Sequence, residues 1–197
     1  MSRPSSYESK HLDTGSNVLV RVEPGQSTFD ACSEAGPNGN VLAVTYERTP
    51  GEWYAEYRAA TNVRPERLSV VTVGETARSG TEVVSRKHLD GAEVTETVSS
   101  PADTGQLCER IGRTLDEFGG STVVYFDSLT ALLRYVDPRE ATRFLLATSG
   151  KVRGSGATAY YRYDPGTHDE RVVARLEPLF DETCSMSDAP DDVLDLG

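Results

Sequence analysis

Residues 121–128, STVVYFDS, decide the fold class, because this apolar run ends in an acid and a serine. A strand that is apolar on both faces is typical of a parallel sheet with helices on either side. One helix is predicted before it, over 100–120 and closed by Gly119-Gly120, and another after it, over 137–150 and ended by Gly150. The order of helix, buried strand and helix predicts an α/β unit.

The rest of the chain continues this alternation. Strands are predicted over 17–22, 40–47 and 67–75, a short extra strand over 94–98, and helices over 27–36 and 49–61. We therefore expect an α/β fold, a three-layer sandwich built on a mostly parallel sheet. Residues 157–176 place a Pro-Gly turn between two apolar runs, which predicts a C-terminal antiparallel hairpin at the sheet edge.

Three predicted helix starts share one pattern, a capping residue, a proline and an acid three positions after the cap. The pattern occurs in Thr49-Pro50-x-Glu52, Ser100-Pro101-x-Asp103 and Asp137-Pro138-x-Glu140. The cap accepts a hydrogen bond from a free backbone N–H, and proline suits the first helical turn. We expect helices to begin at these three points.

The length of 197 residues suits one domain. We expect a flexible N-terminal arm over 1–16, a single domain over 17–180 and an acidic disordered tail over 181–197. The chain shows neither the apolar core of a signal peptide nor a run long enough to span a membrane. Its three cysteines form no CxxC pair. We therefore expect a cytoplasmic protein without membrane association.

The formal net charge is −11, and Lys10, Lys87 and Lys151 are the only lysines. This composition favours a protein that works in concentrated salt, where a Debye length of about 3 Å at 1 M weakens acidic self-repulsion. An ordinary acidic cytosolic protein is the alternative. In both cases the overall field repels nucleic acid, so a nucleic-acid partner is not expected.

Two segments at predicted strand ends carry a resemblance. YFDSLTALL (125–133) is similar to the Walker B strand of the RecA/KaiC-like branch of P-loop ATPases, and YERTP (46–50) resembles the segment that carries its catalytic acid. Over nearly the whole chain the sequence resembles a haloarchaeal family of unknown function, RecA-like or KaiC-like, through TVSSPAD (97–103), YFDSLTALLRYVD (125–137) and DPGTHDER (164–171).

The resemblance implies site residues. Asp127 would hold a magnesium ion through water, and Glu47 would be the catalytic acid. Gly25, Ser27 and Thr28 would contact a nucleotide if one binds. The departure lies at the phosphate loop, because Glu23-Pro24-Gly25-Gln26-Ser27-Thr28 lacks the lysine of G-x-x-x-x-G-K-[ST]. The Walker A motif is therefore interpreted as lost.

Charge around this loop strengthens that interpretation. Ser27 is expected to cap its own helix, while Asp30 and Glu23 place acids where a triphosphate would need a cation. We expect no useful ATP binding, no cofactor and no resident metal. For Asp127 the alternative is a buried remnant that caps a backbone group, and for Glu47 it is a surface acid or a partner of Arg48.

Several other residues allow both a functional and a simpler structural role. Lys151, in SGKVRGSG, follows a predicted helix and is not expected to act as a phosphate-loop lysine. The three histidines have no metal-ligand spacing. Arg139 and Arg143 share a helical face and are predicted to contact a partner; a solvated face that pairs with Asp137 and Glu140 is the alternative.

The sequence predicts a catalytically inactive RecA/KaiC-like domain that serves as a protein-binding or regulatory module in a halophilic cytoplasm. A homo-oligomer is an expectation from the resemblance. Two alternatives stay open, a weakly active ATPase with an atypical phosphate loop and a nucleic-acid-associated factor. The partner, the pathway and the role of residues 76–99 are not fixed by the sequence.

Overall fold

The computed structural model describes residues 15–23, 28–31, 39–74, 93–119, 121–168 and 170–185. Its core is a seven-stranded sheet. The spatial order is β4 (Glu93–Val98), β3 (Leu68–Val73), β2 (Asn40–Thr45), β5 (Thr122–Asp127), β6 (Thr158–Tyr163), β1 (Asn17–Arg21) and β7 (Glu182–Ser185). Every neighbouring pair is parallel.

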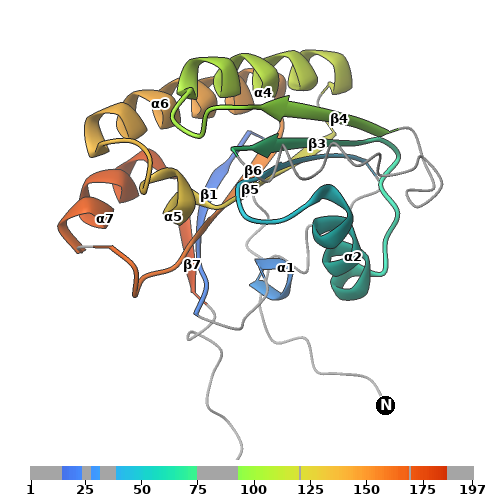
Figure 1. Ribbon diagram of the computed structural model, residues 1–197. Coiled ribbons are helices and arrows are strands. Elements are labelled where there is room, and N and C mark those ends of the chain that lie inside the picture. Colours follow the sequence, from blue (N-terminus) through green and yellow to red (C-terminus); the bar gives the residue numbers. More distant parts are fainter. Residues whose placement is uncertain are drawn as a thin grey trace, which may run out of the picture.

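Helices cover both faces of the sheet (Figure 1). Helices α4 (Thr104–Phe118) and α6 (Pro138–Ser155) lie on one face, and α1 (Thr28–Ala31) and α2 (Pro50–Thr61) lie on the other. The short helices α5 (Leu129–Leu132), α7 (Glu170–Leu176) and η1 (Glu177–Leu179) complete the connections. The predicted three-layer α/β fold is confirmed.

Successive side chains along each strand point to opposite faces of the sheet, so they pack in two separate cores. Under α4 and α6, Phe126 of β5 packs in a cluster with Ile111 and Phe144. Under α1 and α2, Tyr125 packs in a second cluster with Phe29 and Trp53. The ring of Phe29 meets that of Trp53 of α2 edge to face, with 5.4 Å between centroids, and that of Tyr125 of β5 at 5.2 Å, so this one residue ties α1 to α2 and to the sheet.

The helix caps agree with the sequence at two of three starts. Thr49 forms a capping box with Glu52, and Asp137 accepts hydrogen bonds from the N–H groups of Arg139 and Glu140. The third expectation was wrong by one turn. Helix α4 begins at Thr104, and Asp103 caps it by accepting from the Gln106 N–H at 2.9 Å. Ser100 instead accepts the Asp103 N–H with its carbonyl, in the turn that precedes the helix.

The predicted C-terminal hairpin is not formed. Residues Glu170–Leu176 are helix α7, and the strand that follows, β7, pairs with β1 in parallel. Residues 182–185 of the segment expected to be a disordered tail therefore belong to the sheet, and residues 186–197 lie outside the described part of the chain. The short strand predicted over 94–98 is present as β4.

Helix α6 is longer than predicted. It passes through Gly150 and ends at Ser155, where Gly156 takes a left-handed conformation with φ of 71°. Lys151 therefore lies inside a helix, away from any strand end. Among the described helices, none has both the length and the apolar character that crossing a bilayer would need.

Candidate functional site at the carboxyl ends of the strands

The candidate site lies where β2, β5 and β6 end, the edge at which parallel α/β sheets place their ligands. Asp127 is the last residue of β5, and its register partner in β2 is Thr45. Arg162 comes from β6, and Arg48 lies just after β2 and before α2. Parallel pairing thus brings together side chains that are far apart in the sequence.

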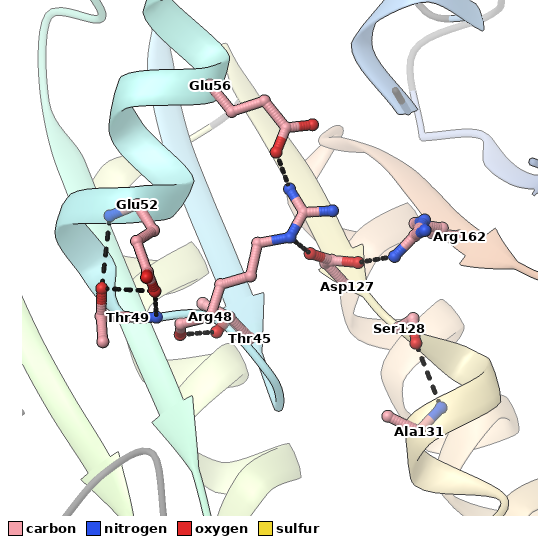
Figure 2. A network of polar contacts seen from close by, with 9 residues as sticks. All are labelled: Thr45, Arg48, Thr49, Glu52, Glu56, Asp127, Ser128, Ala131 and Arg162. Atoms are coloured by element: carbon pink, nitrogen blue, oxygen red, sulfur yellow. Dashed lines mark hydrogen bonds and ion pairs between the residues drawn. The ribbon is translucent and has the colours of Figure 1, made fainter. Parts of the chain in front are cut away.

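Asp127 is held between two arginines (Figure 2). One carboxylate oxygen lies 3.2 Å from Nε of Arg48, and the other lies 3.1 Å from Nη1 of Arg162. Asp127 is only 8% exposed. The guanidinium groups are permanently charged and shielded from bulk water, so both oxygens of this carboxylate are strongly engaged.

Further contacts fix the position of Arg48. Its Nη1 also pairs with Glu56 of α2, and Thr45 Oγ1 donates a hydrogen bond to the Arg48 carbonyl. The capping box of Thr49 follows at once and sets the start of α2. Figure 2 shows Arg48 extended between Glu56 and Asp127. The network therefore alternates in charge: Glu56, Arg48, Asp127, Arg162.

Glu47, the predicted catalytic acid, takes part in a different contact. Its carboxylate lies 2.5 Å from Nη1 of Arg134, and both side chains are about half exposed. The salt-bridge partner of Glu47 is thus Arg134 rather than its neighbour in sequence, Arg48. The described contacts place Glu47 in a surface ion pair beside the Asp127 network, not within it.

A small cavity adjoins Asp127. Its volume is about 10 Å³, which is room for about one water molecule. Thr28 is 6% exposed, and its Oγ1 has no hydrogen-bond partner within the described ranges. Gly25 and Ser27, the other residues predicted to contact a nucleotide, lie outside the described part of the chain. The lining consists of Thr28, Phe29, Arg48, Trp53, Tyr125, Phe126 and Asp127.

The model of DUF7504, a family of unknown function, matches residues 15–186. The chain belongs to the DUF7504 family. No curated protein sequence matches it. Among solved structures it is similar to a protein of Pyrococcus horikoshii OT3 studied as PH0250, with a TM-score of 0.62 and 17% identity, covering 90% of this chain and 85% of that one.

A second solved structure is the flagellar accessory protein FlaH from Methanocaldococcus jannaschii. The TM-score is 0.52 and the identity 13%, with 88% of this chain and 72% of that chain covered. At such identities the likeness concerns the fold alone, which is RecA-like. The expected family of unknown function with a RecA-like fold is therefore confirmed, and the haloarchaeal source and the loss of Walker A stay predictions.

Two residues of this DUF7504 chain were missed as site residues by the sequence reading. Arg162 interrupts the apolar strand TAYYRY, and a charged side chain in such a strand signals a buried partner. Arg48 was considered only as a neighbour of Glu47. Asp127 is buried, as its alternative role required, but its carboxylate engages two arginines instead of capping a backbone group. The capping residue here is Ser128, whose side chain accepts a hydrogen bond from the Ala131 N–H at 3.1 Å.

Metal binding by side-chain clusters finds no support in the described ranges. They contain no group of three or more His, Cys, Asp or Glu residues that could hold an ion.

Nε2 of His168 lies 3.0 Å from the Thr130 carbonyl oxygen, so this nitrogen carries the proton that it donates. That hydrogen bond ties the segment after β6 to α5.

Proposed function

We propose that this DUF7504 chain is a RecA-like module that binds a protein partner and does not hydrolyse ATP. The observation that supports this most directly is the double ion pair of Asp127. In the resemblance, this carboxylate holds a magnesium ion through water. Here both of its oxygens face guanidinium groups, which cannot lose their protons.

Electrostatics disfavours a divalent cation at this point. Two unit charges 4 Å apart interact by about 4 kcal/mol at an effective dielectric of 20, so a dication would be repelled by roughly 8 kcal/mol per arginine. One carboxylate attracts it by a similar amount, and two arginines therefore outweigh one Asp127. Glu56 offsets part of this, but it binds a different nitrogen of Arg48.

The remaining features point the same way. The cavity beside Asp127 has room for about one water molecule. Glu47 is engaged by Arg134, and Gln26 follows Gly25 where the phosphate-loop motif has its lysine. The acid-rich, lysine-poor composition supports a cytoplasm of high salt as the setting. We assign the protein-contacting role to the helix that carries Arg139 and Arg143.

One observation favours the rival function, a weakly active ATPase. Thr28 is buried beside Asp127, and its hydroxyl has no hydrogen-bond partner among the described residues. It follows Ser27, which the match of Gly25-Gln26 to Gly-Lys places at the motif's magnesium-binding Ser or Thr. A rearrangement that moved Arg48 away could bring the Thr28 hydroxyl and Asp127 to one ion. The two functions therefore differ in whether Asp127 can release its arginines.

A titration with ATP in molar KCl, with and without Mg²⁺, tests the proposal. We expect no magnesium-dependent binding and no phosphate release by the wild-type chain. Asp127→Ala and Thr28→Val serve as site variants, and Glu47→Gln as a neighbouring control. Micromolar, magnesium-dependent affinity that both site variants abolish would overturn the proposal in favour of the ATPase.

A further inference from the structure

The exposed large hydrophobic side chains of the described chain lie in the segment between α5 and α6 and in α6 itself. Tyr135 is 53% exposed and Leu146 is 55% exposed, and they are the large hydrophobic side chains that lie exposed within the described ranges. Arg139 and Arg143 fall between them in the sequence. Tyrosine and arginine are the residues most enriched at the centres of protein interfaces, so the composition of this segment is that of a docking surface.

The helix geometry places these groups on one stripe. At 100° per residue, Arg139, Arg143, Leu146, Gly150 and Gly154 lie within about 80° of arc on α6. The opposite side of α6 is buried through Ala141, Leu145 and Val152 among others. We call the five exposed residues the α6 stripe. It faces away from the sheet for its whole length.

Two glycines of the α6 stripe serve no packing purpose within the described chain. A Cβ atom added at Gly150 or Gly154 would meet nothing within 4 Å. Glycine inside a helix costs about 0.5–1 kcal/mol relative to alanine. Small residues one turn apart allow a second helix to approach closely, and Leu146 lies one turn before them. The stripe therefore fits a helix better than an irregular loop.

The arginines of the stripe can still accept a carboxylate. Arg143 is 76% exposed at its side chain and lies 3.4 Å from Glu140, while Arg139 forms no salt bridge within the described ranges. The two nearby acids have other partners. Glu140 accepts from Thr104 Oγ1 at 2.6 Å, and Asp137 accepts from two backbone N–H groups of α6.

The hydrogen bonds from the backbone N–H groups of Glu140 and Arg139 hold the pKa of the Asp137 carboxyl below its usual value. The charges of Arg139 and Arg143 add to the effect. Asp137 is thus committed to capping its own helix. The side chains of both arginines are exposed and remain accessible to an incoming partner.

Two other occupants fit less well. A second copy that placed α6 parallel to α6 would bring arginines against arginines, and an antiparallel copy would place Gly150 and Gly154, not carboxylates, opposite them. A nucleic-acid backbone would offer no apolar surface to the exposed leucine in the middle of the stripe. We propose that the α6 stripe docks an acidic amphipathic helix of another protein. This inference rests on the proposed function as a protein-binding module.

The test uses a synthetic acidic helix of about 20 residues, with leucines on one face and glutamates beside them, long enough to form in water. Backbone amide shifts of the full chain are followed during titration. We expect the shifted amides to cluster over 135–154. Arg139→Glu with Arg143→Glu, and separately Leu146→Asp, should each weaken binding at least about tenfold, as central interface positions do.

The control is Arg113→Glu, which makes the same type of substitution at one position on the exposed side of the neighbouring helix α4 and should leave the affinity unchanged. Thermal unfolding of each variant confirms that it is folded. Four results would overturn the proposal: equal affinity of the Leu146→Asp variant, equal binding of a peptide with lysines in place of glutamates, the same shifts with duplex DNA alone, or self-association that Leu146→Asp abolishes.

The outcomes separate the two proposals. Magnesium-dependent ATP binding with the peptide still seated on the α6 stripe would remove the non-hydrolytic function and leave the docking surface standing. Absence of both ATP binding and peptide binding would remove the docking surface and leave the non-hydrolytic function standing.

Discussion

Arg48 lies against Asp127 with its Nε 3.2 Å from a carboxylate oxygen, although the two residues belong to different strand ends. Arg162 closes the other side of the same carboxylate from β6. One acid therefore joins three adjacent strands at the edge of the sheet where ligands of this fold class bind. In this chain that edge is tied together by protein charges.

Asp127→Asn should destabilise the fold by about 2–4 kcal/mol, because two partly buried arginines would lose their carboxylate. Denaturant unfolding at neutral pH measures the change. Glu47→Gln is the control, since it removes an exposed ion pair and should cost less than about 1 kcal/mol. Equal effects of the two variants would mean that the Asp127 network contributes little to stability.

The start of α4 offers a test of capping. Asp103→Ala should lower the free energy of unfolding by about 1 kcal/mol, because the Gln106 N–H loses its acceptor. Ser100→Ala should change it by less than about 0.5 kcal/mol, since Ser100 contributes its carbonyl there and not its side chain. The opposite ranking would place the cap at Ser100.

Asp181 should make stability depend on pH on the acid side. Burial alone would raise the pKa of its carboxyl, but hydrogen bonds from Arg153 and from the Asn17 N–H outweigh burial and hold the pKa below the usual 3.8. A lowered folded-state pKa means that the stabilisation is complete above 3.8 and is lost as the pH falls through the folded value.

Asp181→Asn should therefore reduce the free energy of unfolding clearly at pH 7 and much less near pH 2, where the wild-type carboxyl is protonated as well. Chemical denaturation of both proteins across this range gives the comparison. A constant difference between them at all pH values would show that the charge of Asp181 is not what stabilises the contact.

Gly150→Ala should stabilise the isolated chain by about 0.5–1 kcal/mol, because its Cβ meets open space and alanine favours the helix. Gly156→Ala should have the opposite sign, since φ there is 71° and alanine is strained in that conformation. Thermal unfolding of both variants checks the pair of signs. Destabilisation by Gly150→Ala would mean that something already packs against α6.

The sequence was informative wherever local pattern decides structure. The apolar run of β5 and the proline-marked starts of α2 and α6 were recognisable because their signals lie within a few residues. The end of α6 was not recognisable in this way. Continuing through Gly150 costs only about 1 kcal/mol, and Val152 beyond it is fully buried, which contributes more.

Helix α7 was misread for a related reason. Val172 and Val173 are β-branched and favour a strand in isolation, yet both pack on the core beneath α7. Arg162 within an apolar strand indicates some buried partner, but the sequence cannot identify Asp127 as that partner, because the pairing depends on the register between β5, β6 and β2. Two arginines on one carboxylate are a property of the assembled sheet and leave no spacing in the sequence.

The last strand has a practical consequence for anyone shortening this protein. A chain cut at residue 180 would lose β7 together with Asp181, and β1 would then present an open row of backbone donors and acceptors along Val18, Leu19 and Val20. Such a row is a template for strands of other molecules. We expect the shortened protein to aggregate, whereas one that keeps Ser185 should stay monodisperse.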